Sequence, residues 1–222
     1  SDVYKRQARL AALEKAVAME HECDVDKQAA SYKTLNEARV LLRRFKSAVG
    51  QFQYCYTAQA EANRQYQSHL KTARLYISHF IQVLNLAVLR NEVRKEHKLF
   101  YGLDPEDFAV PELTGEKHIL VWGERLIEGE RERVSHGGAP IYNPTIAKVT
   151  VHYDIFKEAY REQQNYKLNT TRSQSGLDAL REEADRIILD LWNQVETYYA
   201  DLPAEIRLNR CRAYGVVYYY RS

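Results

Sequence analysis

Glycine and proline are almost missing from the first 101 residues, which contain Gly50 and no proline. Both residues are unfavourable inside helices, glycine because of its backbone entropy and proline because it lacks an N–H and clashes with the preceding turn. The chain also lacks any run of about 18 apolar residues, the length that a membrane-spanning helix needs. The first half is therefore predicted to be nearly continuous helix, with no membrane span in the sequence.

The chain also lacks a large net charge of either sign. The 222 residues include 32 Lys and Arg against 30 Asp and Glu, which leaves a net charge of +2. This balance provides no strong attraction to nucleic acid or to an anionic membrane surface. Nucleic acid is therefore not an expected partner.

Cysteines are few and far apart, at Cys23, Cys55 and Cys211. An odd number without clustering favours neither a disulfide framework nor a zinc site. We expect free thiols, buried or half-buried, in a reducing compartment, and hence a cytoplasmic protein.

The usual catalytic and metal-binding patterns are also missing. A di-iron bundle needs Glu three residues before His on two core helices, and none of the seven histidines has this neighbour. The stretch "EHEC" at 20–23 contains possible ligands but lacks a second pair at metal-site spacing. There is no glycine-rich phosphate loop and no G-x-S-x-G elbow. We expect no cofactor, no metal and no enzyme activity.

One catalytic alternative stays open. Helical nucleases of the HEPN type carry Arg followed a few residues later by His, and Arg90, Asn91 and His97 are the best match here. Seven residues are close to two helical turns, so a helix through this stretch would place Arg90 and His97 on one face. Four Arg/His pairs of this kind occur, where about two are expected by chance, so the pattern discriminates weakly.

The first seven residues, "SDVYKRQ", resemble the translated remnant of a sequencing adapter. We therefore expect the native start to be missing, with helix-forming sequence resuming near Ala8. In that case the lack of a signal peptide says little about targeting.

Apolar residues recur at helical spacing through most of the chain. The pattern predicts helices over 9–22 and from 27 onward, a turn at "ANRQ" (62–65), and a second long helix over 65–100. Gly102 suits a helix C-cap, and a further helix is predicted over 115–135, followed by an extended loop and an Asn143-Pro144 helix start. The tail contains a short helix from Pro203 and the strand-like "VVYYYRS".

The second half repeats the first when it is shifted by 111 residues. The shift aligns Phe45 with Phe156, Ala73 with Ala184, and the predicted turn at 62–65 with "SQSG" at 173–176. Each half then forms one long antiparallel helical hairpin. The predicted segments are 1–7 as a remnant, 8–103 with the first hairpin, 104–143 as a connector with one helix, 144–202 as the second hairpin, and 203–222 as the tail.

Together these features predict an all-α fold. Neither hairpin buries its apolar stripe alone, so we expect the two to pack as an elongated four-helix bundle, with the 115–135 helix bridging it and an extended C-terminal tail beside it. Residues 8–222 are expected to form one structural domain.

Tyrosine is unusually abundant, with 17 residues against six phenylalanines. Tyrosine suits the flanks of a bundle, where the ring packs and the hydroxyl stays in water, but it is also enriched where proteins bind one another. The second interpretation makes eight tyrosines candidate binding residues: Tyr54, Tyr56, Tyr66, Tyr198, Tyr199, Tyr218, Tyr219 and Tyr220.

Three stretches carry a resemblance: residues 74–107, residues 180–203 and the ending "CRAYGVVYYY". They resemble a group of uncharacterised bacterial all-helical proteins built from paired helical hairpins, and the similarity covers most of the chain. The resemblance implies a fold and no activity. The expected function is non-enzymatic, through binding another protein or through self-association.

Overall fold

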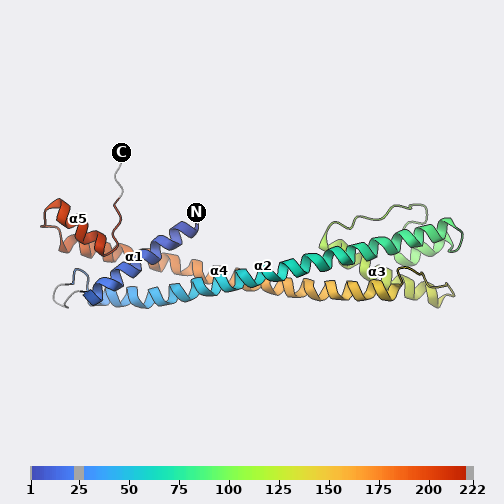
Figure 1. Cartoon of the computed structure of the whole chain (residues 1–222), viewed down its shortest axis with the longest axis horizontal. Coiled ribbons are helices and arrows are strands. Elements are labelled where there is room, and N and C mark those ends of the chain that lie inside the picture. Colours follow the sequence, from blue (N-terminus) through green and yellow to red (C-terminus); the bar gives the residue numbers. More distant parts are fainter. Residues whose placement is uncertain (1, 23–27, 219–222) are drawn as a thin grey trace. The chain divides into compact units, whose positions relative to one another are not determined.

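The structure, a computed structural model, describes residues 2–22 and 28–218 (Figure 1). These residues form α1 (Asp2–Glu22), α2 (Tyr32–Leu89), the 3₁₀ helix η2 (Lys95–Tyr101), α3 (Glu116–Ser135), α4 (Ile146–Tyr198) and α5 (Ala204–Ala213). No strand occurs in this described part, and the all-α prediction is confirmed. The last four residues of the strand-like tail lie outside the described residues.

The two predicted turns are wrong, because α2 continues through 62–65 and α4 through 173–176. Each predicted hairpin is therefore a single helix, of 58 residues in α2 and 53 residues in α4. The stretch 62–65 has no residue that breaks a helix, and Tyr66 immediately after it is buried. Gly176 makes no close contact, and a lone glycine in a helix costs only about 1 kcal/mol. Burial of Leu177 and Leu180 in the next turn offsets that cost.

The predicted helix over 65–100 also ends early, at Leu89. Asn91 adopts a positive φ of 61°, and the Glu92 N–H donates to the Ala87 carbonyl across this turn. Beyond Leu89 the charged sequence "RNEVRKEHK" offers no apolar stripe to hold a longer helix. Gly102 takes the left-handed C-cap that the sequence predicts, with φ of 68°.

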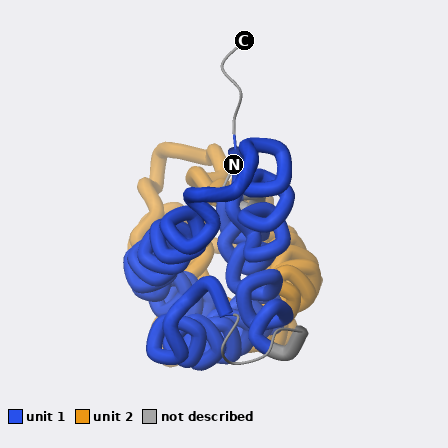
Figure 2. Tube along the Cα trace, turned by 90° about the vertical axis from the view of Figure 1, so that its left-hand side faces the viewer, with its two compact units in different colours: residues 1–56, 169–222 blue, residues 57–168 orange. Residues whose placement is uncertain are grey.

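The chain divides into two compact units, and the division falls inside α2 and inside α4 (Figure 2). Unit 1 contains residues 1–56 and 169–222, and unit 2 contains residues 57–168. Within each unit, part of α2 runs antiparallel to part of α4. Paired side chains show this: Arg44 binds Glu183 at 2.9 Å in unit 1, and Gln163 donates to Asn63 at 3.1 Å in unit 2.

Unit 1 has a core formed by α1, the first part of α2, the last part of α4 and the segment around α5. Cys211 and Tyr214 are fully buried there, and Cys55 is also buried. Both cysteines are free thiols, as the sequence predicts, whereas Cys23 lies outside the described residues. The centre of this core contains Leu13, Ala16, Leu35, Ala38, Leu41, Phe45, Leu177, Ala184, Leu191 and Val195.

Unit 2 packs α3 and η2 against the other parts of α2 and α4. The Tyr153 ring lies directly on Gly123, where an added Cβ would come within 2.2 Å of the ring. The Tyr153 hydroxyl donates to the Leu120 carbonyl at 3.0 Å, which fixes α4 against α3. The core includes Ala73, Ile77, Phe80, Ile81, Leu84, Tyr101, Ile119, Leu126, Val149 and Phe156.

A sequence shift of 111 residues places α2 almost entirely on α4, and residues buried in one are buried in the other. Examples are Ala38 with Val149, Phe45 with Phe156, Ala73 with Ala184, and Leu84 with Val195. These correspondences support the interpretation of the sequence as a duplication.

Each unit also contains a similar helix end closed by glycine. The sequence shift of 111 residues does not place one of these helix ends on the other. Tyr101-Gly102-Leu103 in unit 2 and Tyr214-Gly215-Val216 in unit 1 each have a fully buried tyrosine and a glycine with positive φ. In each, the residue after glycine donates its N–H to a carbonyl five residues earlier, at 3.1 and 3.2 Å. This is the hydrogen bonding of a helix end closed by a left-handed glycine.

Candidate functional site

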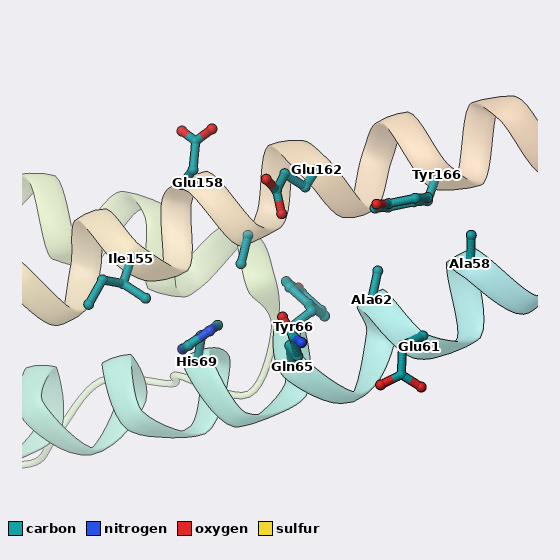
Figure 3. A pocket seen from close by; sticks show the side chains of 11 residues that line it. Ala58, Glu61, Ala62, Gln65, Tyr66, His69, Ile155, Glu158, Glu162 and Tyr166 are labelled. Atoms are coloured by element: carbon teal, nitrogen blue, oxygen red, sulfur yellow. The ribbon is translucent and has the colours of Figure 1, made fainter.

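A groove lies between α2 and α4 in unit 2, with a volume of about 540 Å³ (Figure 3). Residues 58–69 of α2 form one side and residues 155–166 of α4 the other. The lining residues are Ala58, Glu61, Ala62, Gln65, Tyr66, His69, Ile155, Glu158, Ala159, Glu162 and Tyr166.

Small side chains create this groove. Ala58, Ala62 and Ala159 stand where larger residues would fill the space between two facing helices. Tyr66 closes it from within, since its ring packs against Phe156 and Tyr160 with centroid distances of 6.1 and 6.4 Å. In Figure 3 the Tyr66 ring lies between the two helices.

Carboxylates occupy both rims of the groove. Glu61 belongs to α2, whereas Glu158 and Glu162 are one turn apart on α4. In Figure 3, Glu162 extends toward the gap, whereas Glu61 and Glu158 project outward. Glu61 pairs with Arg64 at 3.2 Å and Glu158 with Arg161 at 3.7 Å, but neither arginine lines the groove, and such exposed pairs are weak.

Apolar side chains stand at the two ends of the groove. Ile155 is 42% exposed and Tyr166 is 36% exposed, so both present apolar surface to solvent. With the alanines between them, they give the groove an apolar strip, beside which Gln65, His69 and the rim carboxylates add polar groups. That arrangement suits an elongated ligand that is both apolar and cationic.

Tyr66 is a buried wall residue and not an acid–base group. Burial raises the pKa of its hydroxyl, and the nearby Glu116 carboxylate raises the pKa further. The hydroxyl makes no hydrogen bond with any described residue. The phenol therefore stays protonated at neutral pH.

The structure places the candidate tyrosines in different surroundings. Tyr54, Tyr56 and Tyr198 are exposed, at 72%, 56% and 52%. Tyr66, by contrast, is 2% exposed, and it lines the groove.

The remaining candidates lie toward the C-terminus. Tyr199 is half-buried and packs edge-on against Tyr198, with ring centroids 4.9 Å apart, and the Tyr218 hydroxyl donates to Glu196 at 2.8 Å. Tyr219 and Tyr220 lie outside the described residues.

The exposed tyrosines of unit 1 do not form a single patch. Thr170 of α4 donates to the Cys55 carbonyl of α2. Tyr54 and Tyr56, the neighbours of Cys55, therefore lie beside the part of α4 around residue 170. Tyr198 is 28 residues further along the same helix, or about 42 Å at 1.5 Å per residue. A binding role for these tyrosines stays a prediction.

The prediction that Arg90 and His97 lie on one helical face is wrong. Arg90 lies in the turn after α2 and pairs with Glu92 at 2.9 Å, and Asn91 follows with its positive φ. His97 belongs to the separate 3₁₀ helix and contacts the edge of Phe100, with ring centroids 5.7 Å apart. The three residues therefore do not share a helical face.

Metal-binding side chains are not gathered anywhere in the described part of the chain, where no group of three or more His, Cys, Asp or Glu could hold an ion. The side chains of His21 and Cys23, from the "EHEC" stretch, lie outside the described residues.

The sequence analysis missed a buried charged network in unit 2. Arg133 and Glu130 are each 1% exposed, and Arg133 Nε donates to Glu130 at 3.0 Å and to the Tyr101 hydroxyl at 2.7 Å. Burial, followed by the Glu130 carboxylate, raises the pKa of Tyr101. Glu130 accepts from the Ile141 N–H at 2.7 Å, and Arg133 donates to the Ala139 carbonyl at 2.7 Å.

This network holds the loop after α3, since it binds that loop's backbone directly. The one related sequence feature is Gly129 inside α3, which lies against Phe100 and Tyr101. An added Cβ on Gly129 would come within 2.6 Å of the Phe100 carbonyl oxygen, so the glycine lets η2 approach α3.

A second buried cation, Lys98, anchors the connector after η2. Its amine donates to the Asp107 carbonyl and lies 4.2 Å from the Phe108 ring centroid. Burial lowers its pKa. Asn85 donates to the Phe108 carbonyl at 3.0 Å, so two side chains fix the same short stretch of backbone.

Comparison of the chain with protein families, with curated proteins and with solved structures gives no significant match. None of the described helices is long and apolar enough to cross a membrane.

Proposed function

We propose that this protein is a non-enzymatic helical protein that binds another protein by helix packing. The observation that carries this proposal is the α2/α4 groove of unit 2, with its alanine floor and its exposed apolar ends at Ile155 and Tyr166. Helices associate closely where small residues leave room for a neighbouring helix. The groove offers such room along about three helical turns.

The lining residues support binding more than catalysis. They provide three carboxylates and one imidazole, on rims that face solvent, and Tyr66 is held protonated by its burial. Catalytic sites instead place a base and a nucleophile or electrophile together around one reacting atom. The lining residues of the groove are instead spread along two helices and do not converge on one reacting atom.

Photocrosslinking tests the proposal in living cells. A benzophenone amino acid replaces Gln65, which lines the groove, and in a second variant it replaces Gln82, which is exposed on α2 outside the groove. We expect ultraviolet light to produce a protein adduct of defined mass from position 65 and not from position 82. Filling the groove by Ala62→Trp should abolish that adduct.

Equal crosslinking from both positions, or none from position 65, would contradict the proposal. An adduct of twice the chain mass would instead identify a second copy as the partner, which native mass spectrometry of the purified chain checks independently.

A further inference from the structure

We infer that the partner segment is a basic amphipathic helix from a different protein, an inference that rests on the proposed function. Two properties of the groove define its occupant: the charge of its rims and the shape of its floor. Each restricts the chemistry of the segment that fits.

Charge gives the first restriction. Carboxylates stand on both rims, Glu61 on α2 and Glu158 with Glu162 on α4, and no lysine or arginine lines the groove. Glu162 extends toward the gap, so a segment that lies in the groove has this carboxylate beside it, whereas Glu61 and Glu158 add negative charge at the outer edges of the rims. Lysine or arginine at the flanks of that segment gives favourable ion pairs, whereas Asp or Glu would bring like charges together.

Shape gives the second restriction. The lining covers residues 58–69 of α2, or about 17 Å of helix, so it accommodates about three turns of a neighbouring helix. Ala58, Ala62 and Ala159 permit interaxial distances at the short end of the usual 8–10 Å range. Apolar side chains at i, i+3, i+4 and i+7 of the partner then reach the floor and the apolar ends.

The same charges argue against a second copy in this groove. Two identical grooves packed face to face would bring Glu61, Glu158 and Glu162 of one copy against the same residues of the other. That juxtaposition is destabilising, since neither copy supplies a lining lysine or arginine. A partner of opposite charge fits the groove, and a symmetric dimer through it does not.

Three synthetic peptides test the inference with the full chain. The first is an 18-residue amphipathic helix with an apolar Leu/Ala face flanked by lysines. The second has glutamine in place of every lysine, and the third has glutamate. Fluorescence anisotropy measures the binding of each to the wild-type chain and to Glu158→Gln/Glu162→Gln, and to a control, Glu96→Gln/Glu128→Gln, whose carboxylates are exposed in unit 2 outside the groove.

We expect the lysine peptide to bind about fivefold more tightly than the glutamine peptide, and the glutamate peptide not to bind, as two or three exposed ion pairs predict. The groove variant should weaken the lysine peptide about fivefold and leave the glutamine peptide unchanged. The control variant should change neither. Raising the salt concentration should weaken only the lysine peptide.

Equal binding of the lysine and glutamine peptides would overturn the inference while leaving the proposed function intact, because the groove would still bind a helix. Absence of peptide binding together with an adduct at position 65 would also overturn only the inference. Absence of both would overturn the inference and the proposed function together.

Discussion

Arg133 and Glu130 form an ion pair that is almost completely withdrawn from water, with 1% and 2% of the two side chains exposed. They are three residues apart on α3, and Tyr101 of η2 donates to Glu130 while accepting from Arg133. Removing one partner of such a buried pair destabilises the fold, because the other partner is left as an uncompensated charge.

Arg133→Ala should therefore lower the free energy of unfolding by about 3–5 kcal/mol, and Glu130→Ala by a similar amount. Urea denaturation followed by circular dichroism measures both. Arg131→Ala is the matched control, because Arg131 and Glu128 form an exposed pair with the same spacing on the same helix, and its effect should stay below about 0.5 kcal/mol. An Arg133→Ala effect as small as that of Arg131→Ala would refute the structural role of the network.

Gly123→Ala should destabilise the protein by about 1–3 kcal/mol, because the new methyl group would overlap the Tyr153 ring. Gly50→Ala provides the contrast. Gly50 lies inside α2 with no atom within 4 Å of an added Cβ, so alanine there should stabilise by about 0.5–1 kcal/mol through helix propensity. Thermal denaturation of both variants checks the opposite signs. A Gly123→Ala variant as stable as the wild type would show that Tyr153 does not pack on Gly123, and a destabilising Gly50→Ala would contradict the second half of the prediction.

Alkaline pH should destabilise the fold through three buried tyrosines. Burial is the first cause that raises the pKa of Tyr66, Tyr101 and Tyr153, above the value of about 10 for an unfolded chain. A raised pKa in the folded state means that the stabilisation is complete below pH 10 and is lost as the pH rises toward the folded values, since the unfolded chain loses its protons first.

Absorbance of tyrosinate at 295 nm, recorded during a pH titration, measures this effect. Part of the tyrosine signal should appear only together with loss of helical circular dichroism. In Tyr101→Phe that delayed part should shrink. Full ionisation of all tyrosines near pH 10 with the helices intact would contradict the prediction.

Thiol labelling should report on unit 1, since the two described cysteines, Cys55 and Cys211, both belong to it. In a Cys23→Ser background, the buried Cys55 and Cys211 should react with a chromogenic disulfide far more slowly than in the unfolded chain. Cys211 is fully buried, so its labelling rate in low urea should follow the opening of unit 1. Labelling of Cys211 as fast as that of a free thiol in the folded protein would disprove its burial.

The sequence predicted the helical class and most buried apolar positions because these follow from apolar spacing, which a single sequence displays. The apolar pattern aligned Phe45 with Phe156 and Ala73 with Ala184, and all four are buried. Gly102 was placed correctly because a left-handed helix end has a local residue preference. These features depend on neighbours along the chain.

The uninterrupted lengths of α2 and α4 were not predictable by the same means. A hairpin and a continuous helix have the same apolar period, and "SQSG" at 173–176 has the composition of a turn. Packing of Leu177 and Leu180 with residues far away in sequence determines the outcome. Similarly, Glu130 and Arg133 have the spacing of an ordinary surface pair, and only the fold places them inside.

The groove was missed for a related reason. Ala58, Ala62 and Ala159 are good helix formers, so the sequence gives no sign that their small size matters. Their role appears only when α2 and α4 are paired in register. Tyr66 was singled out by composition, and its burial in the groove wall depends on that pairing with Phe156 and Tyr160.

The division into units has a consequence for the order of synthesis. Unit 2 is one uninterrupted stretch, 57–168, so all of its residues are synthesised before any of residues 169–222. Unit 1 needs residues 1–56 and 169–222 together, so the apolar stripe of its first segment stays uncovered until residues 169–222 have been synthesised. Chaperone binding to the nascent chain is therefore expected to concentrate on this first segment.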